Sequence, residues 1–162
     1  MDLFDAYTSD NVMLSLMSDE MYRSYFRDYE DDPDLCLPGQ VYEHYEYTEE
    51  KVERYIQRQR SSKRVTLAIL CGDEIAGEII IKSIEDHVCA TMGITLKNAK
   101  YKDRGIGTAA EKLAINYVFH ELDIPTLYAD TIQTNTRSQH VLEKAGFFMI
   151  REDKDFKYYR ID

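Results

Sequence analysis

The sequence feature that most constrains the fold is a short two-glycine segment placed directly before a long helical repeat. Residues 102–108 read Lys-Asp-Arg-Gly-Ile-Gly-Thr, and they follow a β-rich run at 89–96. Residues 105–121 predict a helix, because their apolar side chains recur at the i, i+3, i+4, i+7 and i+8 spacing of one helix face (Ala110, Leu113, Ala114, Tyr117 and Val118). A helix with one apolar face must bury it against a sheet or another helix, so a strand–loop–helix unit is expected here.

The same segment predicts a binding site for an anion. Gly105 and Gly107 lack side chains where the backbone must turn sharply and where a ligand would approach it. The start of the following helix adds unpaired N–H groups and the positive end of the helix dipole, which together suit a pyrophosphate. The segment is not a Walker loop, because no Gly-Lys-Ser/Thr follows, and it lacks the third glycine of the dinucleotide fingerprint. A tight turn without a ligand is the alternative interpretation of two glycines alone.

The other periodic segments place this unit in a larger α/β order. Strands are expected at 12–16, 65–70, 75–81, 89–96, 126–132, 147–151 and 156–161. Further helices are expected at about 19–29, 48–59 and 135–144, with Ser18 or Asp19, Thr48, and Asn135 or Thr136 as N-terminal caps and Gly146 as the C-terminal stop. The predicted fold class is α/β, with a mixed, mostly antiparallel sheet flanked by helices on both faces. No repeat or linker interrupts the chain, so one domain over 1–162 is expected.

Composition excludes several classes of protein. A chain of 162 residues with 44% hydrophobic content can bury one core, and no apolar run reaches the ~18 residues of a membrane helix. The N-terminal residues do not resemble a signal peptide, so a cytoplasmic protein without membrane contact is expected. A net charge of −10 argues against a nucleic-acid partner. The three cysteines lack C-x-x-C spacing and the four histidines lack metal-ligand spacing, so neither a disulfide nor a metal site is expected.

Two motifs together resemble the GNAT acetyltransferases. Residues 102–107 are similar to the pyrophosphate loop of that family, [RQ]-x-x-G-x-[GA], with Lys102 in place of the usual Arg or Gln. Residues 135–147 resemble its second signature, an Asn that opens a helix ending in E-K-x-G-F. The form Asn-x-x-Ser with Leu-Glu-Lys-Ala-Gly-Phe is similar to the branch that contains ribosomal-protein N-terminal alanine acetyltransferases. The resemblance covers about 65–160 well and the first 60 residues by element order only.

The resemblance implies a V-shaped opening between the strand that ends near Leu96 and the strand at 126–132, with acetyl-CoA inserted as co-substrate. Its pantetheine amides would pair with the backbone at Ile94, Thr95 and Leu96, as an added strand pairs with a sheet edge. Its pyrophosphate would be held by the backbone N–H groups and cationic side chains of Lys102, Arg104, Gly105, Ile106, Gly107 and Thr108. Asn135 and Ser138 match residues that bind the pantetheine arm or order the site in relatives. Plain capping of the helix is the alternative role for these two residues.

The implied mechanism is direct attack of an amine on the thioester within a ternary complex, without an enzyme nucleophile. Asp130 falls where the family often places a glutamate and is the candidate general base, directly or through water. A purely structural role for Asp130 is the alternative. Many relatives carry a Tyr at the position of Leu142, so no general acid is assigned in this chain.

The acceptor amine is suggested by charge. Residues 28–50 hold nine acidic residues and no Lys or Arg, and in the family this region usually walls the acceptor site. Opposite charge favours a polyamine, an aminoglycoside-like amine or a basic protein N-terminus as acceptor. A solvated acidic face is the alternative.

Two other functions and the oligomeric state stay open. The domain could bind acyl-CoA without turnover, as a sensor or scaffold, or bind a nucleotide other than CoA. A homodimer through the edge strands of the C-terminal hairpin at 147–161 is compatible with the sequence, which does not decide it.

Overall fold

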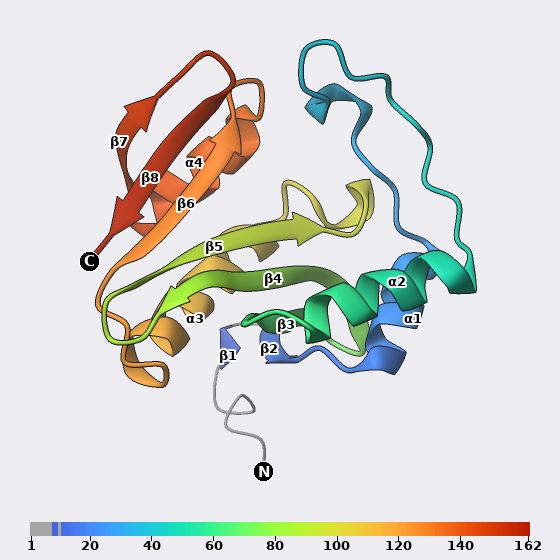
Figure 1. The fold of residues 1–162 in the computed structure, drawn as a ribbon, viewed down its shortest axis with the longest axis horizontal. Helices are drawn as coiled ribbons and strands as arrows, with labels where there is room; N and C mark the ends of the chain where they lie inside the picture. Colours follow the sequence, from blue (N-terminus) through green and yellow to red (C-terminus); the bar gives the residue numbers. More distant parts are fainter. Residues whose placement is uncertain (1–7, 10) are drawn as a thin grey trace.

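The computed structural model describes residues 8, 9 and 11–162, which form one mixed sheet with helices on both faces (Figure 1). Eight strands lie in the order β1-β2-β3-β4-β5-β6-β8-β7. Every neighbouring pair is antiparallel except β5 and β6, which are parallel. The strands are β1 Thr8–Ser9, β2 Val12–Leu16, β3 Val65–Cys71, β4 Glu74–Glu85, β5 Cys89–Leu96, β6 Leu127–Ile132, β7 Phe148–Glu152 and β8 Phe156–Ile161.

Helices cover the two faces of the sheet in pairs. The α-helices are α1 Asp19–Arg27, α2 Glu49–Arg60, α3 Ile106–His120 and α4 Thr136–Ala145, and two short 3-10 turns are η2 Pro33–Leu35 and η3 Ala99–Tyr101. α1 and α2 lie on one face, and α3 and α4 lie on the other (Figure 1). The alternation of β3 explains this layering, because Leu67 and Ile69 join the core under α3 while Ala68 joins the core under α1 and α2.

Local chemistry sets the helix ends. The Ser18 hydroxyl accepts a hydrogen bond from the Met21 N–H at 3.1 Å, and the Thr48 hydroxyl accepts one from the Lys51 N–H at 3.2 Å. Gly146 ends α4 with φ of +110°, in the left-handed region where a side chain would be strained. These are the caps and the stop that the sequence predicts.

The sheet divides between β5 and β6. These strands pair only at Ala90 with Leu127 and at Thr91 with Tyr128. The remainder of β5, residues 92–96, pairs with β4 alone, and the remainder of β6 pairs with β8. The opening implied by the resemblance therefore exists, and it lies at the carboxyl ends of two parallel strands.

The predicted fold class is confirmed, and the differences are local. β1 was not predicted, β4 extends to Glu85 past the predicted end at Ile81, and η2 forms a single turn inside the expected loop at 31–40. Cys36, Cys71 and Cys89 have free thiols. Within the described residues, no helix is both long and apolar enough to cross a membrane.

Candidate active site

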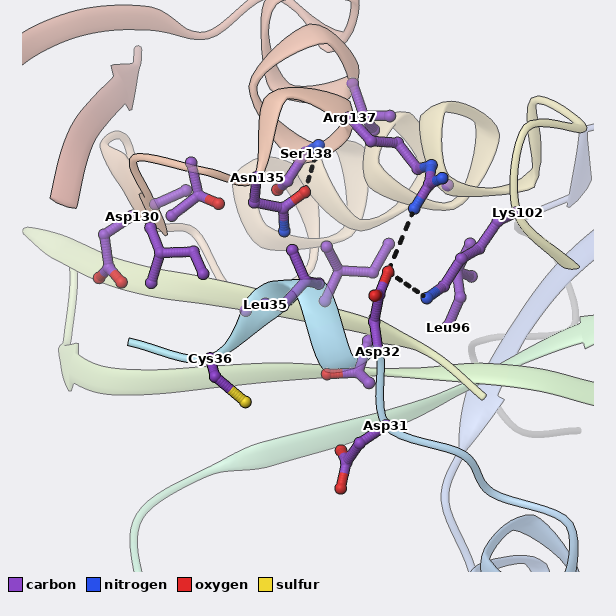
Figure 2. A pocket seen from close by; sticks show the side chains of 18 of the residues that line it. Asp31, Asp32, Leu35, Cys36, Leu96, Lys102, Asp130, Asn135, Arg137 and Ser138 are labelled. Atoms are coloured by element: carbon purple, nitrogen blue, oxygen red, sulfur yellow. Dashed lines mark hydrogen bonds and ion pairs between the residues drawn. The ribbon is translucent and has the colours of Figure 1, made fainter. Parts of the chain in front are cut away.

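The divided sheet opens into a cleft of about 800 Å³ (Figure 2). Residues 92–96 of β5 form one wall and residues 129–132 of β6 form the other. α3 and the first half of α4 form the floor, and residues from the loop between α1 and α2 close a further side. Eight of the predicted site residues line this cleft: Ile94, Thr95, Leu96, Lys102, Gly107, Asp130, Asn135 and Ser138.

The start of α3 has the properties of an anion site. Gly105 occupies the N-cap position with φ of +75° and provides no side-chain cap, so the first N–H groups of α3 are left for a ligand. A Cβ at Gly105 would meet no atom within 4 Å, and one at Gly107 would lie 3.6 Å from Val141 Cγ1. The glycines are therefore not required by crowding with protein atoms. The positive φ of Gly105 and the open space beside it fit a backbone cradle for a phosphate.

A second cavity of about 700 Å³ adjoins this helix start. Its lining includes Gly105 and Thr108 of the predicted loop, and Arg137, His140 and Lys144 on α4. Both cavities share the lining residues Leu96, Gly107, Arg137 and Val141, so they adjoin each other at the start of α3. Sequence reasoning did not identify the α4 cations, although Arg137 lies inside the second signature.

Two predicted loop residues do not line either cavity with their side chains. Ile106 is 4% exposed and packs in the core, and the Arg104 guanidinium donates to the Lys100 carbonyl at 3.3 Å. Only the backbone N–H groups of these residues are placed near the cradle.

Asn135 and Ser138 lie at the start of α4, beside the cleft (Figure 2). Asn135 Oδ1 accepts a hydrogen bond from the Ser138 N–H at 3.1 Å, so the capping role is real. The Asn135 Nδ2 group has no hydrogen-bond partner in the described part of the chain, which leaves a donor for a ligand. Leu142, 2% exposed, lines the same floor with a side chain that cannot supply a proton.

Asp130 is exposed on β6, opposite Tyr158 of β8 in the strand ladder. Asp130 lies at one edge of the cleft (Figure 2), and residues 8–9 and 11–162 provide its carboxylate with no hydrogen-bond or ion-pair partner. A carboxylate in this state is available to accept a proton from an amine or from water.

The acidic segment contributes four of its nine acidic side chains to the cleft lining: Glu30, Asp31, Asp32 and Glu43. The segment is attached to the end of β5, because Asp28 forms an ion pair with Lys97 at 3.0 Å and the Glu30 N–H donates to the Lys97 carbonyl at 3.0 Å. The Tyr29 hydroxyl donates to Asp31 at 2.5 Å. The loop therefore brings negative charge and tyrosine rings to the side of the cleft opposite β6.

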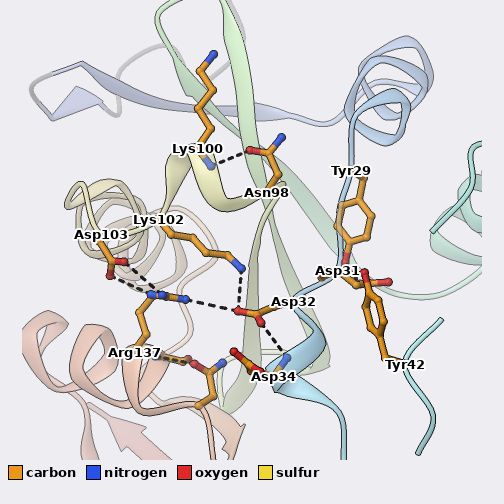
Figure 3. Close-up of polar contacts among 12 residues, drawn as sticks. Tyr29, Asp31, Asp32, Asp34, Tyr42, Asn98, Lys100, Lys102, Asp103 and Arg137 are labelled. Carbon is orange, nitrogen blue, oxygen red and sulfur yellow. Dashed lines mark hydrogen bonds and ion pairs between the residues drawn. The ribbon is translucent and has the colours of Figure 1, made fainter. Parts of the chain in front are cut away.

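An ion network joins this loop to the anion site (Figure 3). Asp32 Oδ2 lies 3.2 Å from Lys102 Nζ and 3.8 Å from Arg137 Nη1. Arg137 also binds Asp103, with Nε 2.9 Å from Oδ1 and Nη2 3.3 Å from Oδ2. The hydrogen bond from the Asp34 N–H lowers the pKa of Asp32, and Lys102 and Arg137 lower it further. In this conformation the Asp32 carboxylate pairs with Lys102, which is one of the cations expected to face a pyrophosphate, and with Arg137.

Glu111, on the floor of the cleft, was missed by sequence reasoning. It lies on α3, is 0% exposed, and both carboxylate oxygens lack hydrogen-bond partners among the described residues. Burial raises its pKa to about 8. The sequence did contain a sign of this residue. Glu111 is a charged residue four positions after Gly107, so it lies on the same face of the predicted helix as the glycine loop, among apolar positions. No group of three or more His, Cys, Asp or Glu side chains in the described ranges is arranged to hold a metal.

A sheet split between parallel strands, with an uncapped glycine-initiated helix at its open end, suits proteins that bind an extended ligand with an anionic end. The family model described as "Acetyltransferase (GNAT) domain" matches residues 8–148. The chain belongs to the GNAT acetyltransferase family, whose members are acetyl-CoA-dependent N-acetyltransferases.

Individual relatives agree with this assignment. A 58-residue stretch is 41% identical to the Probable N-acetyltransferase YjcK of Bacillus subtilis and spans 36% of this chain but only 32% of that protein. A GNAT-family acetyltransferase from Bacillus anthracis shares the fold with a TM-score of 0.75, at 19% identity over 96% of each chain. Campylobacter jejuni N-acetyltransferase PseH in complex with acetyl coenzyme A has a TM-score of 0.61, at 22% identity over 69% of this chain and 77% of that one.

Proposed function

We propose that this chain, as one domain over 1–162, transfers an acetyl group from acetyl-CoA to a primary amine of a cationic acceptor. The observation that carries the proposal is a single cleft that joins an anion cradle at the start of α3 to an acidic wall formed by Glu30, Asp31 and Glu43, with Asp130 on the opposite side on β6. One end suits the phosphates of the donor and the other suits a positively charged acceptor.

The proposed donor site uses residues from three elements. The backbone at Ile94, Thr95 and Leu96 pairs with the pantetheine arm, because the edge of β5 that faces β6 has no ladder partner beyond Thr91. The N–H groups from Arg104 to Thr108 hold the pyrophosphate, with Lys102 and Arg137 adding charge. Asn135 Nδ2 and the Ser138 hydroxyl face the same arm from α4.

Asp130 is the proposed general base. An alkylammonium with a pKa near ~10.4 needs about 4 to 5 kcal/mol to lose its proton at pH 7, whereas an α-amino group near ~7.8 needs about 1 kcal/mol. A base therefore matters most for a polyamine-like acceptor. The neutral amine then attacks the thioester carbonyl, the C–N bond forms, the nitrogen loses its second proton to water, and the C–S bond breaks. The departing thiolate, with a thiol pKa of about 8.5, is a good leaving group that can take its proton from water.

Among cationic acceptors we favour a polyamine. The acidic wall lies beside Tyr29 and Tyr42, whose rings suit contact with an alkylammonium (Figure 3). A spermidine N-acetyltransferase from Vibrio cholerae, solved in complex with CoA and spermine, shares the fold with a TM-score of 0.75, at 17% identity over 94% of this chain and 96% of that one. An aminoglycoside-like amine and a basic protein N-terminus are the competing acceptors, and the likeness of residues 135–147 to ribosomal-protein acetyltransferases favours the last.

The test is release of free thiol from acetyl-CoA with spermidine, an aminoglycoside, and peptides that begin with Ala, Ser or Met. We expect turnover with spermidine and a loss of about 10²- to 10⁴-fold in kcat/KM for Asp130→Asn, the usual range for a lost general base. Asp73→Asn is the matched control, because Asp73 is an exposed aspartate in the turn between β3 and β4 and does not line the cleft.

A second variant tests the acidic wall. Glu43→Gln should raise KM for spermidine severalfold and leave KM for a neutral-tailed peptide unchanged, because it removes a charge and not a catalytic group. Preference for a peptide over spermidine would assign the protein to the N-terminal acetyltransferases instead. Tight binding of acetyl-CoA without thiol release from any amine would favour the non-catalytic sensor.

We propose a cytoplasmic location and a homodimer. The dimer is supported by the outer edge strand β7, where Phe148, Met149 and Ile150 are 51%, 48% and 48% exposed.

A further inference from the structure

Glu111 combines two properties that rarely occur together outside ligand sites. Its side chain is fully buried, and neither carboxylate oxygen has a hydrogen-bond partner within residues 8–9 and 11–162. Buried polar groups without partners are uncommon, because each loses its contacts with water and gains nothing in return. Glu111 also lines the cleft. A ligand in the cleft would therefore supply what the protein does not.

Its position along α3 indicates which part of a ligand it would meet. Gly107 and Glu111 are four residues apart, so they share a helix face and are separated by about 6 Å along the axis. Gly107 belongs to the anion cradle. Helix α3 lies behind β4 and β5 (Figure 1), and both Gly107 and Glu111 line the cleft. A ligand anchored by its phosphates at Gly105 and extended along β5 passes over Glu111 with its arm, not with its phosphates.

Burial favours the neutral form of this carboxyl, because it raises the pKa of Glu111. Met92 and Ala129 on the two strands and Leu142 on α4, which line the same cleft as Glu111, are apolar and buried. The charged groups that face the cleft from β6, α4 and the loops are Asp130, Arg137, Lys102, Asp32, Asp31, Glu30 and Glu43, and none of them contributes to the shift in its pKa, for which burial is the sole cause. A neutral carboxylic acid donates one hydrogen bond and accepts others, which is the complement of an amide.

We propose that Glu111 binds an amide group of the pantetheine arm as a neutral carboxylic acid and thereby selects an amide-bearing donor over a bare nucleotide. The inference rests on the proposed placement of acetyl-CoA in this cleft. Glu111 is a binding residue here, and no proton transfer to the substrate is assigned to it. The arm provides carbonyl oxygens and N–H groups in the segment between the pyrophosphate and the thioester. A cationic amine at the same place would instead require the ionised form.

The experiment measures binding by calorimetry, with acetyl-CoA and with 3′-phospho-ADP, which keeps the nucleotide and lacks the arm. For Glu111→Leu we expect about 3- to 10-fold weaker acetyl-CoA binding, the usual effect of one lost hydrogen bond, and unchanged binding of 3′-phospho-ADP. Glu111→Gln, which keeps a donor and an acceptor, should stay within about 3-fold of the unmodified protein for both ligands. Far-ultraviolet circular dichroism verifies that each variant is folded.

The pH dependence provides a readout that a purely structural role would not give. Acetyl-CoA has no free thiol, so affinity that falls as the pH rises through about 8 reports the loss of the Glu111 proton. Glu111→Gln should remove this fall. Equal weakening of both ligands in Glu111→Leu, no weakening of either, or no binding of acetyl-CoA at all would each overturn the inference. The binding experiment contains no acceptor amine, so it does not depend on turnover. If the separate activity test gave no thiol release, the proposed acetyl transfer would be contradicted, but the result on Glu111 would still hold.

Discussion

At the scale of single residues, Glu111 makes the stability of the protein depend on pH. Its pKa is about 8 when folded, against 4.5 ordinarily. Well below pH 4.5 the Glu111 carboxyl is protonated in both the folded and the unfolded chain, so folding does not require it to take up a proton and its ionisation does not reduce the stability. As the pH rises from 4.5 to 8 the unfolded chain loses the proton first, so stability falls, and above pH 8 the penalty is constant. Glu111→Gln should therefore stabilise the protein, by on the order of 4 kcal/mol at pH 8 and by much less at pH 5.

Urea denaturation at pH 5 and pH 8 measures this difference. Glu46→Gln is the matched control, because Glu46 is exposed and its carboxylate makes no hydrogen bond or ion pair within the described chain. A Glu111→Gln difference that is the same at both pH values would show that the carboxyl ionises normally in the folded protein. The same result would also remove the basis for the expected pH dependence of acetyl-CoA binding.

At the scale of elements, the proposed placement of acetyl-CoA puts the loop between α1 and α2 in competition with the donor for the start of α3. Asp32 is paired with Lys102 and Arg137, so a pyrophosphate must displace its carboxylate to use these cations. Asp32→Asn should therefore strengthen acetyl-CoA binding, by about 3- to 10-fold at low salt, and make that binding more salt-dependent. Titrations at several KCl concentrations measure both effects.

Asp34→Asn is the control for the Asp32 variant. Asp34 lies two residues further along the chain, and its exposed side chain carries the same charge. If Asp32→Asn weakens acetyl-CoA binding, Asp32 orients Lys102 and Arg137 for the phosphates and does not compete with them. Equal gains in both variants would show that only the total charge of the loop matters.

At the scale of the whole molecule, the sequence predicted those features of the fold that depend on residues close to each other in the chain. Helix bounds, strand alternation and the caps at Ser18, Thr48 and Gly146 follow from interactions over a few residues. The split between β5 and β6 followed only from the resemblance. The contact between Asp32 and Lys102 joins residues 70 apart and could not be predicted, because it depends on how the loop folds back over the sheet.

The outer edge of the sheet carries the last prediction. In the described sheet β7 pairs only with β8, all five of its residues are exposed, and three of them, Phe148, Met149 and Ile150, have large apolar side chains. The register shift between Met149 and Arg151 marks an irregularity at Ile150, which disfavours a continuous ladder with a second chain. We therefore expect two copies to meet through these side chains.

Light scattering on the eluted protein should give twice the chain mass of 19.0 kDa, and Met149→Lys should return it to 19.0 kDa. Val88→Lys is the matched control. Val88 is also 48% exposed, but it lies in the turn between β4 and β5 and is not part of β7 or β8. A single-chain mass for the unmodified protein at high concentration would leave β7 as an edge protected by its bulge. Because the cleft is lined within one chain, Met149→Lys should leave kcat/KM unchanged, and a fall in activity on dissociation would show that the second copy completes the site.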